Sequence, residues 1–75
     1  RIVFEDSKGR LWLGFNGNGL GMYDPHNGNT RLWNTGMQKE KTIIGNLVFD
    51  ICEDKEGIIW ITTNNGVTGI DIEQD

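Results

Sequence analysis

Short apolar runs alternate with turn-forming clusters along the whole chain. The runs are rich in β-branched and aromatic residues, and none of them continues with the period of a helix. The clusters between them are rich in Gly, Asn and Asp, which favour tight turns. This pattern predicts an all-β chain of antiparallel strands. The expected strands are 1–5, 10–15, 20–23, 30–34, 47–53, 58–63 and 67–72.

One unit of the sequence occurs twice. An Asp, a Gly and a Trp stand at the same spacing in two places that are 48 positions apart, and an Asn/Gly loop follows each Trp. These structural repeat residues are Asp6, Gly9 and Trp12, and then Asp54, Gly57 and Trp60. A repeat of this period is typical of propellers and solenoids. Four strands followed by three predict antiparallel four-stranded meanders, about two blades of a β-propeller.

The repeat divides the 75 residues into three parts. Blade one is expected at about 1–34, a connection at 35–46, and an incomplete blade two at about 47–75. A chain this short builds only a small core, and its single cysteine, Cys52, cannot form an internal disulfide. We therefore expect a piece of a longer repeat protein, a β-propeller fragment whose open faces are covered by neighbouring blades or by other copies.

Charge and hydropathy exclude two classes of partner. The formal net charge of −4 disfavours nucleic acid, which requires a basic face. No apolar run is long enough to span a membrane. No Cys/His cluster suggests a metal, and no cofactor is predicted. Unpaired edge strands, at 1–5 or 67–72, predict self-association.

The second copy of the unit resembles the two-component regulator propeller repeat. The resemblance rests on Glu53-Asp54-x-x-Gly57-x-Ile59-Trp60-Ile61-x-Thr63-x-x-Gly66-Val67. The first copy fits as Asp6-Ser7-Lys8-Gly9-Arg10-Leu11-Trp12-Leu13-Gly14-Phe15. Phe15 replaces the usual Thr, Thr62 replaces the usual Gly, and 68–70 lacks the common aromatic ending. These departures affect packing.

The resemblance implies a function for the chain. Similar proteins are bacterial hybrid two-component sensors, whose periplasmic propellers often recognise oligosaccharides and signal to a histidine kinase. We therefore expect an extracytoplasmic, non-catalytic, ligand-sensing propeller fragment, with any kinase outside this chain. Two alternatives remain open: a fragment of a sialidase-like glycoside hydrolase, and a structural blade pair for protein–protein contact.

Most reactive side chains have a structural interpretation. Neighbouring carboxylates in Glu5-Asp6 and Glu53-Asp54 point to opposite faces of a strand and cannot act together. Gly17-x-Gly19-x-Gly21 resembles part of a phosphate loop, but a strand follows it where a helix is needed. His26 is expected in a solvated turn, and Cys52 as a small buried residue in mid-strand. Because Trp12 and Trp60 repeat, we expect them to pack rather than to stack on a ligand.

Binding residues favour loops on a rigid scaffold. In a four-stranded blade, the loop after the second strand and the connection to the next blade emerge on the same side. The candidate ligand-binding residues are Asn16, Asn18, Asn64, Asn65 and Trp33. The long connection 35–46 is the strongest candidate for ligand specificity, and Lys39-Glu40-Lys41 within it is expected to be solvated.

Overall fold

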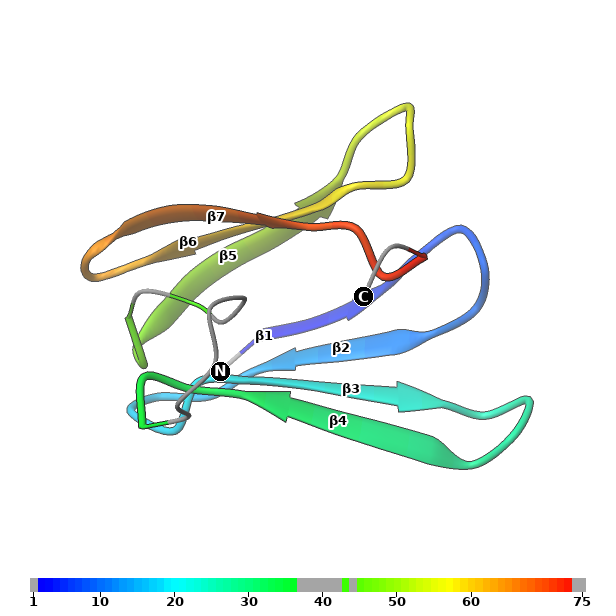
Figure 1. Ribbon diagram of the computed structural model, residues 1–75, viewed down its shortest axis with the longest axis horizontal. Helices are drawn as coiled ribbons and strands as arrows, with labels where there is room; N and C mark the ends of the chain where they lie inside the picture. The colour runs from blue at the N-terminus through cyan, green and yellow to red at the C-terminus, as the bar shows by residue number, and fades with distance from the viewer. Residues whose placement is uncertain (1, 37–42, 44, 74–75) are drawn as a thin grey trace.

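A computed structural model describes residues 2–36, 43 and 45–73 of the chain as seven strands in two antiparallel sheets (Figure 1). The strands are β1 (Ile2–Glu5), β2 (Leu11–Gly14), β3 (Leu20–Asp24), β4 (Asn29–Trp33), β5 (Val48–Glu53), β6 (Ile59–Thr63) and β7 (Gly66–Ile70). Within these described ranges no helix is long and apolar enough to cross a membrane.

Each sheet is a simple meander. The first sheet has the order β1-β2-β3-β4 and the second the order β5-β6-β7, and every neighbouring pair is antiparallel. Short turns connect successive strands because Gly supplies positive φ angles in them, for example 81° at Gly9 and 85° at Gly57. The predicted fold class is therefore confirmed, with four strands followed by three. The proposed domain limits stay a prediction.

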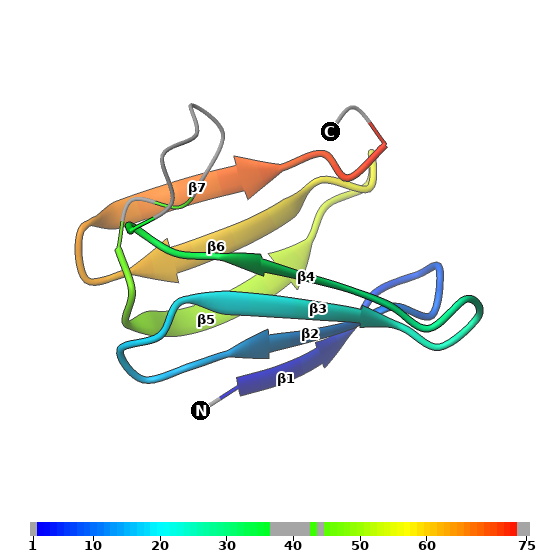
Figure 2. The ribbon, with the colours of Figure 1, turned by 60° about the horizontal axis from the view of Figure 1, so that its bottom comes forward.

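The two sheets lie face to face, with β5 against β1 and β2 (Figures 1 and 2). Because side chains alternate across a strand, each sheet presents one set of residues to the other. Sheet one contributes an aromatic face and sheet two an aliphatic face. The buried core contains Trp12, Leu20, Met22 and Trp33 from the first sheet and Val48, Ile51, Ile59, Ile61 and Ile70 from the second, with Ile43 beside them.

The fit between the sheets is close at Gly14. A Cβ atom built on Gly14 would lie 2.6 Å from Cγ1 of Val48 on the facing sheet. The contact leaves no room for a side chain, so glycine is required here by packing. Burial of the apolar area between the sheets provides the main stabilisation of so small a unit.

Each sheet also has an open face. Val3, Tyr23 and Leu32 are exposed on sheet one, and Trp60 and Val67 are exposed on sheet two. The two tryptophans of the repeat therefore differ. Trp12 lies between the sheets and is fully buried, whereas Trp60 lies on the open face with 40% of its surface exposed.

One prediction of burial is wrong. Cys52 was expected to be buried, but it is exposed. It follows Ile51, which points into the core, so the period of two turns Cys52 towards the open face. Trp33, a candidate ligand residue, lies on β4, the edge strand of sheet one, and is only 2% exposed. Its ring stacks on Trp12 with 5.4 Å between centroids.

Candidate functional site

The Asp-Gly-Trp units form the same turn at one end of both sheets. Oδ1 of Asp6 accepts hydrogen bonds from the backbone amides of Lys8 at 2.9 Å and Arg10 at 3.0 Å. Oδ1 of Asp54 accepts the two equivalent bonds at 2.9 and 3.0 Å. Gly9 donates its amide to the carbonyl of Asp6, which closes the turn. Each aspartate therefore accepts two backbone bonds within its own turn.

The same aspartates also hold the repeated tryptophans. Oδ2 of Asp6 accepts a hydrogen bond from Nε1 of Trp12 at 2.8 Å, and Oδ2 of Asp54 accepts one from Nε1 of Trp60 at 2.9 Å. Sequence reasoning missed this bond, although the fixed spacing of six residues between Asp and Trp is its signal. Each aspartate therefore fixes a turn and orients an indole ring at once.

These contacts lower the pKa of both aspartates. Burial, the largest influence on Asp6, raises its pKa, but hydrogen bonds from Trp12, Arg10 and Lys8 together outweigh burial and bring the pKa below its ordinary value. The pKa of Asp54 is lowered first by the bond from Trp60. Both side chains are therefore anionic acceptors at neutral pH.

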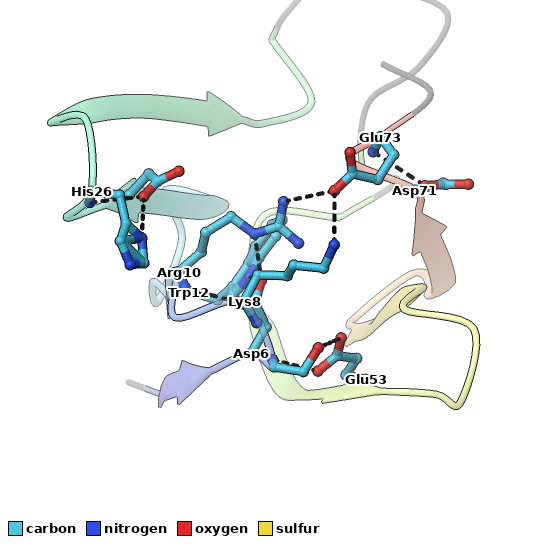
Figure 3. Close-up of polar contacts among 10 residues, drawn as sticks. Asp6, Lys8, Arg10, Trp12, His26, Glu53, Asp71 and Glu73 are labelled. Atoms are coloured by element: carbon cyan, nitrogen blue, oxygen red, sulfur yellow. Dashed lines mark hydrogen bonds and ion pairs between the residues drawn. The ribbon is translucent and has the colours of Figure 1, made fainter.

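Further polar contacts at this end link blade one to blade two (Figure 3). The backbone amide and the hydroxyl of Ser7 donate to the two carboxylate oxygens of Glu53 at 2.8 and 2.7 Å. Nη1 of Arg10 lies 3.5 Å from Glu73, and Nζ of Lys8 lies 3.9 Å from it. Arg10 also pairs with Asp6 at 2.7 Å. This end of the molecule therefore consists of charges and donors that bind one another across the two blades.

The opposite end brings together the loops that the sequence marks for ligand binding. Asn46 lies at their centre. Its carbonyl oxygen accepts bonds from the amides of Gly17 at 3.1 Å and Gly19 at 2.9 Å. Its side chain accepts from the backbone amide of Thr35 at 2.8 Å and donates to the Thr35 hydroxyl at 2.7 Å. One residue thus ties the β2–β3 loop, the end of β4 and the start of blade two together.

The second Asn/Gly loop joins the same group. The amide of Asn64 donates to the carbonyl of Leu47 at 3.1 Å, and the amide of Leu47 donates to Oδ1 of Asn64 at 3.3 Å. Leu47 also forms a bridge with Asn16. The loops of both blades therefore lie side by side, and we call the group Asn16–Gly19, 34–36, 45–47 and 64–65 the Asn-rich end.

The candidate ligand residues occupy different positions at this end. Asn16, Asn18, Asn64 and Asn65 are all exposed, but Oδ1 of Asn64 is already used to hold Leu47. Trp33 lies underneath, with its carbonyl so close to Gly19 that no side chain fits there. The ligand roles of these five residues stay predictions. Lys39, Glu40 and Lys41 lie outside the described residues.

Sequence reasoning did not single out Asn46. Its equivalent in the repeat would precede residue 1, so comparison of the two copies cannot mark it. Its only sequence signal is its place, directly before the first strand of the second unit. The contacts between the loops reveal its role, because its partners are up to 29 positions away.

Other candidate side chains are also accounted for by local contacts. His26 is exposed in the β3–β4 turn as predicted, and its backbone amide donates to Oδ1 of Asp24 at 3.0 Å. Both carboxylate oxygens of Glu53 are occupied by Ser7. Within 2–36, 43 and 45–73, no three His, Cys, Asp or Glu side chains are grouped as a metal site would need.

Two stacked antiparallel meanders that repeat an Asp-turn-Trp unit are blades of a β-propeller. Residues 42–65 match the family model described as "Two component regulator propeller". That segment, which includes β5 and β6, is therefore similar to a repeat of this family, in agreement with the sequence motif. No curated protein matches the chain.

Proposed function

We infer that this chain is part of an extracytoplasmic sensor propeller that binds an oligosaccharide at its Asn-rich end. The main observation is that the Asn/Gly loops of the two blades meet at neighbouring residues, the first loop at Asn46 and the second at Leu47, in a chain whose residues 42–65 match the two-component regulator propeller model. The proposal includes no chemical step in this chain. Signal output to a histidine kinase would use segments outside it.

The chemistry of this end suits a sugar. Each Asn side chain offers an amide donor and a carbonyl acceptor, which complement hydroxyl groups that both donate and accept. The exposed amides of Asn16, Asn18 and Asn65 stand on loops whose backbone is held by hydrogen bonds. Rigid loops reduce the entropy lost when a ligand binds. Ligand binding across loops of two blades would then favour one blade packing over another.

The hydrolase alternative is less well supported by the contacts. Glycoside hydrolysis requires two carboxyl groups on either side of a glycosidic bond. Glu53 uses both oxygens to hold Ser7, and Asp6 and Asp54 each hold a turn and a tryptophan. These carboxylates have structural partners, so the binding function is the better interpretation.

Titration of the ¹⁵N-labelled chain with a panel of neutral and acidic oligosaccharides tests the proposal. We expect amide chemical-shift changes that are confined to the Asn-rich end and saturate with ligand. The double variant Asn16→Ala, Asn18→Ala should weaken the binding at least ~10-fold, which corresponds to about 1.4 kcal/mol.

The matched control is Asn27→Ala, an exposed asparagine in the β3–β4 turn at the other end, which should bind as the unchanged chain does. Shift changes centred on the Asp turns, or no response to any member of the panel at millimolar concentration, would contradict the proposal.

A further inference from the structure

We propose that the two open faces of this blade pair bind each other, so that copies of the chain stack head to tail. The head face is the open face of sheet one, and the tail face is the open face of sheet two. The head face comprises Val3, Leu11, Leu13, Tyr23 and Leu32. The tail face comprises Cys52, Trp60, Thr62, Val67 and Gly69.

The tail face corresponds in the repeat to the face of sheet one that packs against sheet two inside the chain. Trp60 is the repeat equivalent of Trp12, and Val67 pairs with β6 at the position where Leu20 pairs with β2. Trp12 and Leu20 are fully buried against blade two, whereas Trp60 and Val67 are 40% and 59% exposed. At Trp60 and Val67 the tail face therefore repeats a surface that, in blade one, is covered by the next blade, whereas Thr62 and Gly69 stand where blade one has Gly14 and Met22.

The head face corresponds in the repeat to the face of sheet two that packs against sheet one. Val3 and Leu13 are the repeat equivalents of Ile51 and Ile61, which lie 48 positions further on. Ile51 and Ile61 are 5% and 0% exposed beneath the tryptophan face of blade one, whereas Val3 is 64% exposed. Placing a tail face on the head face of another copy would therefore reproduce an interface that this chain already forms.

The polar pair at the edge of the interface inside the chain has an equivalent pair in the stack. Inside the chain, the amide and hydroxyl of Ser7 donate to Glu53. The positions 48 residues away are Lys55 and Glu5, both exposed. In the stack, the amide and ammonium groups of Lys55 would face the carboxylate of Glu5 on the next copy. Lys55 thus supplies hydrogen-bond donors where Ser7 supplies them inside the chain, and its positive charge attracts the negative charge of Glu5.

A second pair repeats with donor and acceptor exchanged between the blades. Nζ of Lys8 lies 3.9 Å from Glu73 inside the chain. Lys8 corresponds to Glu56, and Glu73 corresponds to His26, since each of these two residues donates its amide to an Asp two positions earlier. In the stack, Glu56 would therefore face His26 of the next copy, whose imidazole N–H can donate to the Glu56 carboxylate.

The stack has a defined symmetry. Head and tail are different surfaces, so the contact is heterologous, and each added copy leaves one head and one tail open. Growth therefore continues beyond a dimer until a ring closes or a filament forms. This differs from pairing of edge strands, which would leave both faces open.

Two variants, each of which blocks one face, test the proposed stacking. Val3→Lys places a charge in the head face, and Val67→Lys places one in the tail face. Sedimentation velocity from micromolar to millimolar concentration should show that the unchanged chain grows beyond a dimer. Each variant alone should associate at least ~10-fold more weakly, because lysine cannot be desolvated in an apolar contact.

The decisive sample is an equimolar mixture of the two variants. Val3→Lys retains an intact tail and Val67→Lys an intact head, so together they should form a capped dimer of two chains and nothing larger. Asn18→Lys, which adds the same charge on the β2–β3 loop at the Asn-rich end, away from both faces, should assemble like the unchanged chain. Circular dichroism of every variant checks that the strands are retained.

A charge exchange tests the same orientation with exposed residues whose substitution spares the core. Glu5→Lys and Lys55→Glu should each weaken association by up to about 5-fold, and their mixture should restore it. An unchanged chain that stays monomeric at millimolar concentration would overturn the proposal. So would blocked variants that assemble normally, or a mixture that remains monomeric while the unchanged chain associates.

Discussion

At the scale of single residues, the most informative contact is the bond from each repeated aspartate to the tryptophan six positions later. Asp6 is 6% exposed and accepts bonds from Lys8, Arg10 and Trp12 through its two oxygens. A carboxylate is the one side chain of this size that accepts in so many directions. The conservative replacement by Asn therefore cannot satisfy all of these donors.

We predict that Asp6→Asn lowers the free energy of unfolding by about 2 kcal/mol at pH 7, since buried hydrogen bonds to a charged group are lost. The difference from the unchanged chain should narrow as the pH falls. The folded pKa of Asp6 lies below its unfolded value, so its contribution is complete above pH ~4 and is lost as the pH drops through the folded pKa. Urea unfolding between pH 7 and pH 3 measures both effects.

Asp54→Asn is the matched control for this prediction. It changes the same turn in blade two, but Trp60 is 40% exposed there and water can replace the lost bond. Its effect at pH 7 should be clearly smaller than that of Asp6→Asn. Equal losses for the two variants, or a constant difference across the pH range, would show that the buried network is not the cause.

At the scale of elements, the loops at the Asn-rich end depend on one another through Asn46. The β2–β3 loop bonds to the backbone of Asn46, and the end of β4 bonds to its side chain through Thr35. The amides of Gly17 and Gly19 find their acceptor on Asn46 rather than within their own loop, so this loop needs the segment before β5 to satisfy its backbone. Their arrangement is therefore a property of the group.

We expect Asn46→Ala to lower the free energy of unfolding by about 1 kcal/mol through loss of the two bonds to Thr35. Hydrogen exchange should accelerate at the amides of Gly17, Gly19 and Thr35 before the rest of the sheets is affected. Asn18→Ala, an exposed residue of the same loop, is the control and should leave exchange unchanged. Uniform acceleration across both sheets would mean that Asn46 stabilises the whole fold rather than this end.

At the scale of the whole molecule, the two sheets depend on the interface between them. A single antiparallel sheet of this size leaves an apolar face in water, and burial against a second sheet removes that cost. Trp12 from one side and Ile61 from the other are fully buried there. The two blades should therefore unfold together.

Ile61→Ala tests this dependence. It leaves a cavity in the middle of the interface, and we expect a loss of about 2–4 kcal/mol, most of the stability of so small a unit. Far-UV circular dichroism and tryptophan fluorescence should report one shared transition in the unchanged chain and in the variant. Thr62→Ala, next to it but on the open face, is the control. Two separate transitions would contradict the mutual dependence of the sheets.

The sequence by itself determined the local structure of this protein. Turn residues at Asp6, Gly9 and their copies, together with the apolar runs between them, predicted all seven strands and the antiparallel meander, because strand length and turn geometry depend on neighbours in the chain. The repeat also predicted two blades and the loops that lie at one end of both.

The tertiary structure decided which face of each strand is covered. Apolar residues occupy both faces of the strands, so the sequence cannot distinguish buried Trp12 from exposed Trp60, which share one motif. Cys52 was expected to be buried because a free cysteine in mid-strand usually is, but it is exposed. Asn46 acquires its role only when loops far apart in the chain meet. Burial and long-range hydrogen bonds depend on the packing of one blade on the next, and that packing depends on the whole fold rather than on any single stretch of sequence.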